Sequence, residues 1–412
     1  MVKILHFADA HIDMVRYGRR DPETGMPVRV LDFLKSLDTI IAAALDEKVD
    51  LVIFAGDAYK DRNPTPSFQR EWGKRIMRLS RAGIPTLLLV GNHDLSPSHG
   101  RAHALDAFYT LEVPHVYVID EPVFLTQDDL EGLPVQIIAI PWLSRSGIMA
   151  KMNIQEKNVE EIYGQMEEKI SKLVSHWLEQ TNPSIPTILA AHASVQGAVY
   201  GGERLVMLGR EMTLPLSLLR SPKLDYVALG HIHKAQDLNE NGHHPVIYPG
   251  SIERVDFGEA EDDKFFVIAN VDKGKTTYEW RELKDIRPFI DLNITLKDTE
   301  NITGQLLKVL FDAGEIREAI VRLTIEYPRE LEPKIDDSAL YKAASEAFEF
   351  HLIKHPVETA SRARIPGGKS ISNLSPLELL DLYWKAVHLD DETRLQHLRK
   401  MAEEIIRETT IN

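Results

Sequence analysis

An apolar run that ends abruptly in polar residues occurs at positions 86–94, with the sequence Thr-Leu-Leu-Leu-Val-Gly-Asn-His-Asp. The run has the length of a strand, and it is almost entirely apolar, as strands are when both faces of their sheet are covered. Gly91 permits a tight turn that presents the next side chain. The nonapeptide therefore predicts a buried strand whose carboxyl end carries Asn92, His93 and Asp94.

The same pattern recurs along the first 285 residues. Further apolar runs of strand length occupy residues 4–8, 51–55, 135–140, 187–191 and 226–229. Polar clusters follow four of them directly, namely Asp9-Ala10-His11, Gly56-Asp57, His192 and Gly230-His231-Ile232-His233. Helical stretches lie between the runs, which predicts an α/β fold with sheets sandwiched between helices. Because ligands of such sheets bind outside the carboxyl ends of the strands, we expect these clusters to meet at one edge.

The predicted cluster is a set of metal ligands. It contains two carboxylates, one amide oxygen and four imidazoles, from Asp9, His11, Asp57, Asn92, His192, His231 and His233. Seven oxygen and nitrogen donors suit two divalent cations that share a carboxylate, and Mn²⁺, Fe²⁺ and Zn²⁺ all accept such donors. A pair of ions roughly 3.5–4 Å apart clamps the attacking and leaving oxygens of a phosphoryl transfer. The sequence therefore predicts a two-metal phosphoesterase, with His93 as a proton donor or transition-state stabiliser.

Composition narrows the classes of protein and partner. The 412 residues suffice for two or three domains, and the absence of cysteine excludes thiolate ligands and fits a reducing cytoplasm. A net charge of −15 disfavours a protein that binds nucleic acid by itself through nonspecific phosphate contacts. The sequence has no run of 18 apolar residues, and the run before Asp9 is too short for a signal sequence. We therefore expect a cytoplasmic protein without a membrane span.

The chain is expected to divide into three parts. Residues 1–285 form the first domain, and residues 286–366 read as a small α+β domain. The elements predicted in this second domain are strands at 289–296 and 319–327 and helices at 303–313 and 337–349. Pro366-Gly367-Gly368 separates a helical tail, residues 371–412, in which Ser375-Pro376-Leu377-Glu378 has a capping-box pattern. The amphipathic tail helices could pack on their own domain or bind a partner, and the residues leave both readings open.

The clusters together resemble the motif set of the calcineurin-like metallophosphoesterase superfamily. More narrowly, residues 248–259 (YPGSIERVDFGE) resemble the segment that closes the active site in the SbcD-type DNA repair exonucleases. Residues 287–291 and 320–323 resemble parts of the capping domain of those enzymes. The resemblance implies a four-layer α-β-β-α phosphoesterase domain at 1–285, a capping, DNA-recognition domain at 286–366 and a tail at 371–412 that docks on a partner ATPase.

The resemblance also implies roles for the site residues. One ion would be held by Asp9, His11, Asp57 and His233, and the other by Asp57, Asn92, His192 and His231, so that Asp57 bridges them. His93 would assist the leaving oxygen. The family resembled uses Mn²⁺ best and acts as a homodimer bound to two copies of an SMC-like coiled-coil ATPase in DNA repair, recombination and replication. Its activities are exonuclease on duplex DNA and endonuclease on single strands.

Two other functions and several weaker candidates follow from the same residues. A small-molecule phosphatase or phosphodiesterase would suit a bare catalytic domain, and a non-catalytic scaffold at DNA ends would suit a chain that lacks a ligand or His93. Asp94 departs from the Gly-Asn-His-Glu of the superfamily's protein phosphatases. Lys60 stands where relatives often carry a histidine, and with Arg16 and Arg254 it is a candidate DNA contact. For self-association, the candidate helices are near 68–82 and 103–111.

Overall fold

A computed structural model describes residues 1–95, 102–144, 159–201, 211–296, 300–357, 375–386 and 392–409. The chain forms two compact units, one of Met1–Glu326 with Pro333–His355 and one of Tyr327–Glu332 with Pro356–Asn412. The Pro366-Gly367-Gly368 break lies outside the described residues, and the division into three domains stays a prediction. None of the described helices is both long and apolar enough to cross a membrane.

Two six-stranded sheets form the centre of the first unit. The first sheet has the order β14-β13-β1-β2-β3-β4, in which β1 to β4 are parallel and β13 pairs antiparallel with both β1 and β14. Its strands are β1 (Val2–Phe7), β2 (Leu51–Phe54), β3 (Thr86–Leu89), β4 (Val116–Ile119), β13 (Phe265–Val271) and β14 (Thr277–Glu282). The second sheet has the order β11-β12-β10-β7-β6-β5, with antiparallel strands only at its two edges. Its strands are β5 (Val123–Leu125), β6 (Gln136–Ile140), β7 (Thr187–His192), β10 (Tyr226–Gly230), β11 (Gln236–Asp237) and β12 (Val246–Tyr248).

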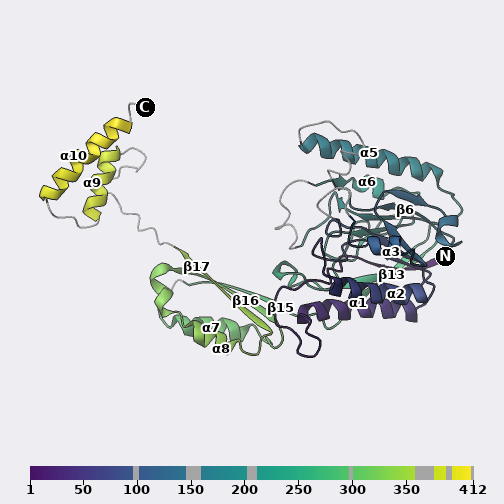
Figure 1. Cartoon of the computed structure of the whole chain (residues 1–412), viewed down its shortest axis with the longest axis horizontal. Helices are drawn as coiled ribbons and strands as arrows, with labels where there is room; N and C mark the ends of the chain where they lie inside the picture. Colours follow the sequence, from purple (N-terminus) through teal and green to yellow (C-terminus); the bar gives the residue numbers. More distant parts are fainter. Residues whose placement is uncertain are drawn as a thin grey trace. The chain divides into compact units, whose positions relative to one another are not determined.

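Helices cover the outer face of each sheet (Figure 1). Side chains alternate along each strand, so Phe7 of β1 packs in the helix-covered core while Ile4 enters the core between the sheets. In the second sheet Ile138 faces the helices and Ile137 the inter-sheet core. The covering helices are α1 (Val28–Asp46), α2 (Pro66–Arg81), α5 (Val159–Gln180) and α6 (Leu216–Leu219). Shorter elements are α3 (Asp106–Thr110), η1 (Asp128–Leu130), β8 (Ser194–Val195), β9 (Thr213–Leu214) and η3 (Phe257–Glu259). The predicted four-layer α-β-β-α fold is confirmed.

His6 of β1 joins the two sheets through contacts with β10. Its Nδ1 accepts a hydrogen bond from the Tyr226 hydroxyl at 3.0 Å, and its Nε2–H donates to the carbonyl oxygen of Leu229 at 3.1 Å. Burial lowers the pKa of His6 to about 3, so the ring is neutral at pH 7. His6 is therefore a buried core histidine with both ring nitrogens hydrogen-bonded.

A three-stranded sheet, β15-β16-β17, forms the next part of the chain. Its elements are β15 (Phe289–Thr295), α7 (Ile302–Asp312), β16 (Ile320–Pro328), η4 (Arg329–Lys334), α8 (Asp337–Ala343) and β17 (Glu349–Val357). The helix predicted at 337–349 was wrong in its second half, because α8 ends at Ala343 and β17 begins at Glu349. Residues 344–349 are mostly good helix formers, but the pairing of β17 with β16 is a tertiary interaction that local propensity does not contain.

Charged and aromatic contacts attach this three-stranded sheet to the four-layer part. Arg287 donates to both carboxylate oxygens of Asp32, at 2.6 and 2.9 Å, and its guanidinium lies 3.9 Å from the centre of the Phe348 ring. The Tyr17 ring packs edge-on against Phe257, which belongs to the segment after β12. A bidentate ion pair that also stacks on an aromatic ring fixes orientation as well as distance. The Phe257 ring also packs edge-on against Phe289 of β15, so the segment after β12 contacts both parts.

The described tail consists of two helices, α9 (Pro376–Ala386) and α10 (Glu392–Thr409). The main-chain N–H of Ser375 donates to the Glu378 carboxylate at 2.8 Å, and the N–H of Glu378 donates to the Ser375 hydroxyl at 3.3 Å. This reciprocal pair confirms the predicted capping box. Arg399 of α10 pairs with Asp381 of α9 at 3.2 Å, so the helices contact each other.

Candidate metal centre

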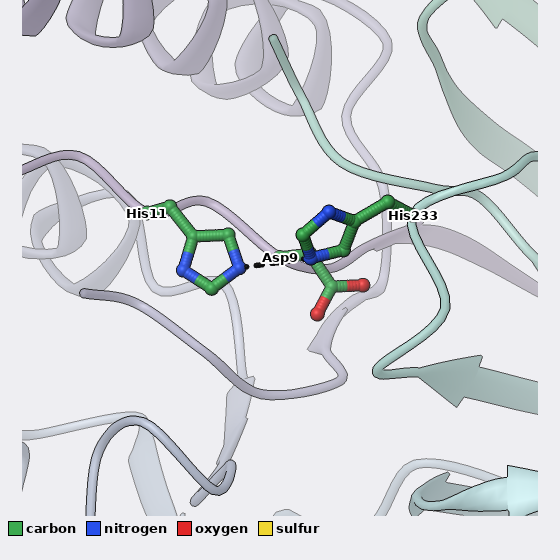
Figure 2. A group of neighbouring side chains, drawn as sticks. All are labelled: Asp9, His11 and His233. Atoms are coloured by element: carbon green, nitrogen blue, oxygen red, sulfur yellow. Dashed lines mark hydrogen bonds between the residues drawn. The ribbon is translucent and has the colours of Figure 1, made fainter. Parts of the chain in front are cut away.

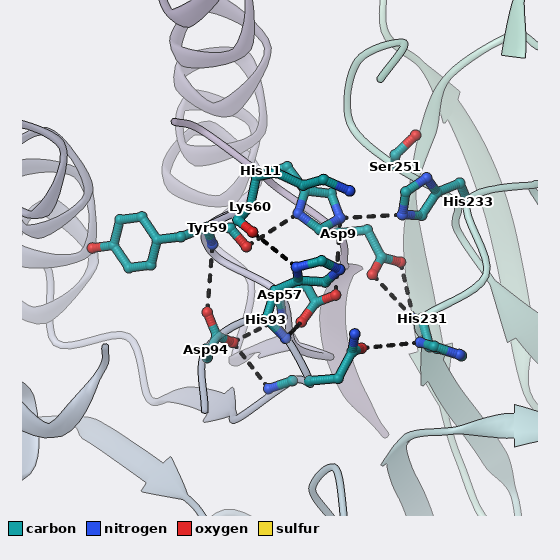
Figure 3. Close-up of polar contacts among 12 residues, drawn as sticks. Asp9, His11, Asp57, Tyr59, Lys60, His93, Asp94, His231, His233 and Ser251 are labelled. Carbon is teal, nitrogen blue, oxygen red and sulfur yellow. Dashed lines mark hydrogen bonds and ion pairs between the residues drawn. The ribbon is translucent and has the colours of Figure 1, made fainter. Parts of the chain in front are cut away.

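The ends of five strands deliver the predicted ligands to one place, and Figure 3 shows those labelled Asp9, His11, Asp57, His231 and His233. Asp9 follows β1, Asp57 follows β2, Asn92 follows β3, His192 ends β7, and His231 and His233 follow β10. The backbone φ angles of Asp9, Asp57 and His231 are 50°, 64° and 102°, a region that residues other than glycine seldom adopt. Such strain persists where the surrounding structure over-determines it, and it clusters at functional sites.

The first group of side chains is Asp9, His11 and His233, whose ligand atoms all lie within 4.8 Å of one another. Figure 2 shows the two imidazoles facing each other, and their Nε2 atoms are 3.1 Å apart. The Nδ1–H of His11 donates to the carbonyl oxygen of Tyr59 at 3.1 Å, and that of His233 donates to Glu259 at 2.7 Å. A carbonyl and a carboxylate can only accept a hydrogen bond, so the proton of each neutral imidazole lies on Nδ1 and the lone pair lies on Nε2.

The side-chain oxygen of Asn92 faces two further imidazoles. The Nδ1–H of His192 donates to the carbonyl oxygen of Ala55 at 2.6 Å, which leaves its Nε2 lone pair 3.0 Å from Asn92 Oδ1. The Nε2 of His231 lies 3.2 Å from each oxygen of Glu211, which leaves its Nδ1 lone pair 3.1 Å from the same Asn92 oxygen. In their neutral forms both rings therefore direct a nitrogen lone pair toward the side-chain oxygen of Asn92.

Asp57 lies between the two sets. Its Oδ2 is 3.9 Å from Nε2 of His11 and 3.6 Å from Nε2 of His192. Asp9, Asp57 and His192 form a second group within 4.8 Å, so Asp9 belongs to both groups. Lone pairs that face one another repel unless a cation lies between them. The donor atoms are nitrogen and oxygen only, and the residues present fit a divalent-metal centre.

Asp57 and His192 stabilise each other's charged form. Burial raises the pKa of the Asp57 carboxyl, but His192 and His93 outweigh burial and hold that pKa well below its usual range. Burial lowers the pKa of the His192 imidazole, but Asp57 outweighs burial and raises that pKa to about 9. Without a cation the Nε2 of His192 is therefore protonated at pH 7, and a divalent cation would displace that proton to reach the lone pair. The centre therefore attracts positive charge to the position between the groups, which is where a divalent cation would bind.

His93 lies beside the ligands but outside both groups. Its Nδ1–H donates to the carbonyl oxygen of Lys60 at 2.8 Å, and its main-chain N–H donates to Oδ1 of Asp57 at 2.8 Å. The ring packs edge-on against His11, with centroids 5.3 Å apart. Burial lowers the pKa of His93 below its usual value. The main chain of His93 thus orients Asp57, while its side chain is held by the loop after β2.

Asp94 ties together the loops after β2 and β3. One of its oxygens accepts the main-chain N–H of Asp57 and of Gly91, both at 2.9 Å. The other accepts the N–H of Ala58 at 3.0 Å and of Tyr59 at 3.4 Å. Asp94 is fully buried. Because four main-chain groups share one carboxylate, the positions of Asp57 and Asn92 depend on each other before any ligand binds.

Glycines at the strand ends allow the main chain to approach the ligands. A Cβ on Gly91 would overlap both Oδ1 and the main-chain nitrogen of Asp57, and a Cβ on Gly56, whose φ is +100°, would overlap the His192 ring. Glycine is therefore required at these two positions because the main chain lies too close to the ligands to leave room for a Cβ, and not only because the chain turns there.

Gly91→Ala is expected to lower phosphodiesterase activity about 100-fold, because displacement of a ligand by about 1 Å has an effect of that size. The Mn²⁺ affinity should fall with it, measured by isothermal titration calorimetry on the folded chain. Gly73→Ala is the control, since its Cβ would meet nothing within 4 Å. Wild-type activity and affinity in Gly91→Ala would contradict the close-approach explanation.

The candidate DNA contacts have different surroundings. Arg16 and Lys60 line a hollow of about 590 Å³ together with Arg20 and Arg70. Arg254 instead donates from Nε and Nη1 to the carbonyl oxygens of Glu259 and Arg287, at 3.1 and 3.2 Å. Its guanidinium therefore holds the segment after β12, and its contact with DNA stays a prediction.

Three residues at the centre were not predicted from the sequence. Glu211 and Glu259 accept from His231 and His233, and the Trp142 ring lies 4.9 Å from the His231 ring. Glu259 is the last residue of segment 248–259, whose resemblance to the active-site-closing segment could have indicated a role for it. Glu211 and Trp142 follow no motif, and only the fold brings them to the ligands.

Comparison with known proteins relates this chain to a family and to several nucleases. The sequence profile described as calcineurin-like phosphoesterase matches residues 2–235. The SbcD component of the nuclease SbcCD of Escherichia coli K12 is 24% identical over 416 residues, which cover 96% of each chain. Its counterpart of the same name from Bacillus subtilis 168 is 28% identical over 293 residues, 68% of this chain and 69% of that one. DNA double-strand break repair protein Mre11 of Archaeoglobus fulgidus is 23% identical over 320 residues, 75% of this chain and 65% of that one.

Proposed function

This chain belongs to the calcineurin-like phosphoesterase family, and we propose that it is a two-metal DNA nuclease. The observation that supports phosphodiester hydrolysis most directly is the set of imidazole and amide lone pairs that face one another around Asp57. The proposed ligands are Asp9, His11, Asp57 and His233 for one ion and Asp57, Asn92, His192 and His231 for the other. Bound Mn²⁺ ions would polarise the phosphoryl group and lower the pKa of a water molecule between them.

The protein residues prepare this chemistry by fixing orientation. Hydrogen bonds from His11 to Tyr59 and from His192 to Ala55 select the tautomers that present Nε2 to the ions. His93 stands next to the ligands without belonging to them, and we assign it the task of assisting the leaving oxygen. Its Nδ1–H is held by Lys60, so the proton that His93 would deliver to the substrate is the Nε2 proton of its imidazolium form.

DNA as the substrate is supported by the extent of the likeness and by local charge. The similarity to a nuclease component covers 96% of this chain and therefore continues past the family profile, which ends at residue 235. The hollow beside Lys60 has four cations in its lining, against the carboxylates Asp13 and Asp61. In a chain of net charge −15, a locally basic hollow beside the metal ligands suits a phosphate backbone.

The proposal includes exonuclease action on duplex DNA, endonuclease action on single strands, and a complex with an SMC-like ATPase in DNA repair. Exposed apolar side chains on the tail helices, Leu379, Tyr383, Met401 and Ile405, support a partner there. Exposed Tyr109 and Leu111, 73% and 74% accessible, support self-association near α3. A pull-down with the full chain, with a chain that ends at Gly368 as control, tests the ATPase contact.

A cleavage assay distinguishes the candidate functions. The purified chain with Mn²⁺ is given end-labelled duplex, circular single-stranded DNA and bis-p-nitrophenyl phosphate. We expect shortened duplex and nicked circles. Hydrolysis of the small ester alone would identify a small-molecule phosphodiesterase. Intact substrates, with Mn²⁺ binding shown separately, would favour a non-catalytic scaffold.

Arg16→Gln with Lys60→Gln is expected to weaken duplex binding about tenfold or more and to reduce the slope of log affinity against log salt by about 2, because each cation at a phosphate releases a counterion. Fluorescence anisotropy of labelled duplex in EDTA measures both quantities without cleavage. Lys48→Gln with Lys275→Gln removes the same charge from exposed positions outside the hollow. An equal loss in this control would show that overall charge, and not the hollow, determines binding.

A further inference from the structure

The four imidazoles at the centre are held by two kinds of acceptor. His11 and His192 donate to main-chain carbonyls, whereas His231 and His233 have carboxylates as partners. A carbonyl is fixed by the backbone, but a carboxylate must itself be held in place before it can orient a ring. The surroundings of Glu259, the partner of His233, show how this is done.

Glu259 divides its two oxygens between His233 and a buried cation. Oε1 accepts the Nδ1–H of His233 at 2.7 Å. Oε2 accepts from Lys264 Nζ at 2.6 Å, from the Ser251 hydroxyl at 2.8 Å and from the main-chain N–H of Val255 at 3.2 Å. Glu259 and Lys264 are each 1% exposed, and Lys264 also donates to Ser251 at 2.8 Å. The carboxylate therefore has four partners and no freedom to rotate.

A buried lysine is rare, because removing an ammonium group from water costs several kcal/mol. Here the positive charge of Lys264 cancels the negative charge of Glu259, so the pair adds no net charge near the ligands. The pair therefore acts on His233 by orienting its ring: the acceptor at Nδ1 directs Nε2 toward His11, 3.1 Å away. The N–H of Ser251 also donates to the carbonyl oxygen of His233 at 3.1 Å, so main chain and ring are fixed by the same segment (Figure 3).

We propose that Glu259 and Lys264 are a positioning pair for His233, in which Lys264 neutralises and fixes Glu259 and Glu259 sets the tautomer and direction of the ring toward the ion at Asp9, His11 and His233. The inference rests on the proposed metal centre but not on DNA as the substrate. It joins the segment after β12 and the start of β13 to the ion, since Glu259 precedes β13 by six residues and Lys264 stands directly before it.

Two double variants separate positioning from packing. Glu259→Leu with Lys264→Met removes the ion pair and the acceptor for His233. Glu259→Gln with Lys264→Met also removes the ion pair but keeps a carbonyl oxygen that can accept the Nδ1–H. Neither leaves an unpaired buried charge, and replacement of a whole buried ion pair by neutral side chains is often tolerated. Thermal unfolding of both metal-free variants, followed by circular dichroism, verifies that they fold.

The measurement is Mn²⁺ binding to the full metal-free chain by isothermal titration calorimetry. We expect wild type and the Gln/Met variant to bind two ions alike, and the Leu/Met variant to bind one ion about 10- to 100-fold more weakly, the usual effect of losing such a partner. Wild-type affinity for both ions in Leu/Met would overturn the proposal, as would equal weakening in both variants. A wild-type chain that binds no Mn²⁺ would overturn the metal centre itself, whereas failure to cut DNA would leave the positioning pair unaffected.

Discussion

Asp57→Ala is expected to reduce phosphodiesterase activity by a factor on the order of 1,000 or more, which corresponds to about 4 kcal/mol of lost transition-state stabilisation. Asp57 places one oxygen between His11 and His192, at 3.9 and 3.6 Å from their Nε2 atoms. Without it the two proposed ligand sets lose the carboxylate assigned to bridge them, and the pKa of His192 loses the influence that raises it. Both metal affinities should fall, and steady-state kinetics with calorimetry measure the two effects.

The control for this substitution is Asp46→Ala, at an exposed position on α1. The fold of Asp57→Ala should persist, because Asp94 bonds to the main chain and not to the side chain of residue 57. If Asp57→Ala bound two Mn²⁺ ions with wild-type affinity, the assignment of Asp57 as the bridging ligand would be wrong.

His93→Ala is expected to lower kcat by about 100- to 10,000-fold while both metal affinities remain unchanged, the range typical of a lost proton donor. Two structural facts explain why kcat should fall while metal affinity stays the same. His93 belongs to neither ligand group, and its contribution to the orientation of Asp57 comes from its main-chain N–H, which alanine retains. Single-turnover cleavage at saturating Mn²⁺, beside calorimetry of Mn²⁺ binding, measures the two quantities.

His115→Ala serves as the matched histidine control, since His115 pairs with Glu131 on the surface. A substrate with a better leaving group than an alkoxide should recover part of the activity of His93→Ala, because such a group needs less help from a proton. Loss of metal from His93→Ala would instead show that His93 is a ligand.

The sequence predicted the fold and the location of the site for one reason. Parallel strands buried on both faces are recognisable as short apolar runs, and their carboxyl ends share an edge. In the structure the end of residues 86–94 lies beside Asp57, where the main-chain N–H of His93 donates to Oδ1, although a long helical connection separates the two strands. The α8–β17 boundary was missed because residues 344–349 carry no local signal against a helix, and β17 exists through its neighbour β16.

Other features could not be read from the sequence because they depend on distances between loops. Nothing around Glu211 marks it as the acceptor for His231, and nothing in the Lys264 segment shows that this lysine is buried. Arg254 illustrates the reverse case. Its charge made it a candidate for DNA, whereas its donors are engaged by two main-chain carbonyls. The charge of a residue can be read from the sequence, but its hydrogen-bond partners in the fold cannot.

The four main-chain bonds accepted by Asp94 have a consequence for how the protein matures in the cell. Because one carboxylate already fixes the loops that carry Asp57 and Asn92, the chain can complete its folding first and acquire ions afterwards. Which ions it acquires then depends on the supply it meets as a finished protein, since nitrogen and oxygen donors accept several divalent cations. Chelation should correspondingly be reversible, and loading could be repeated over the lifetime of a single molecule.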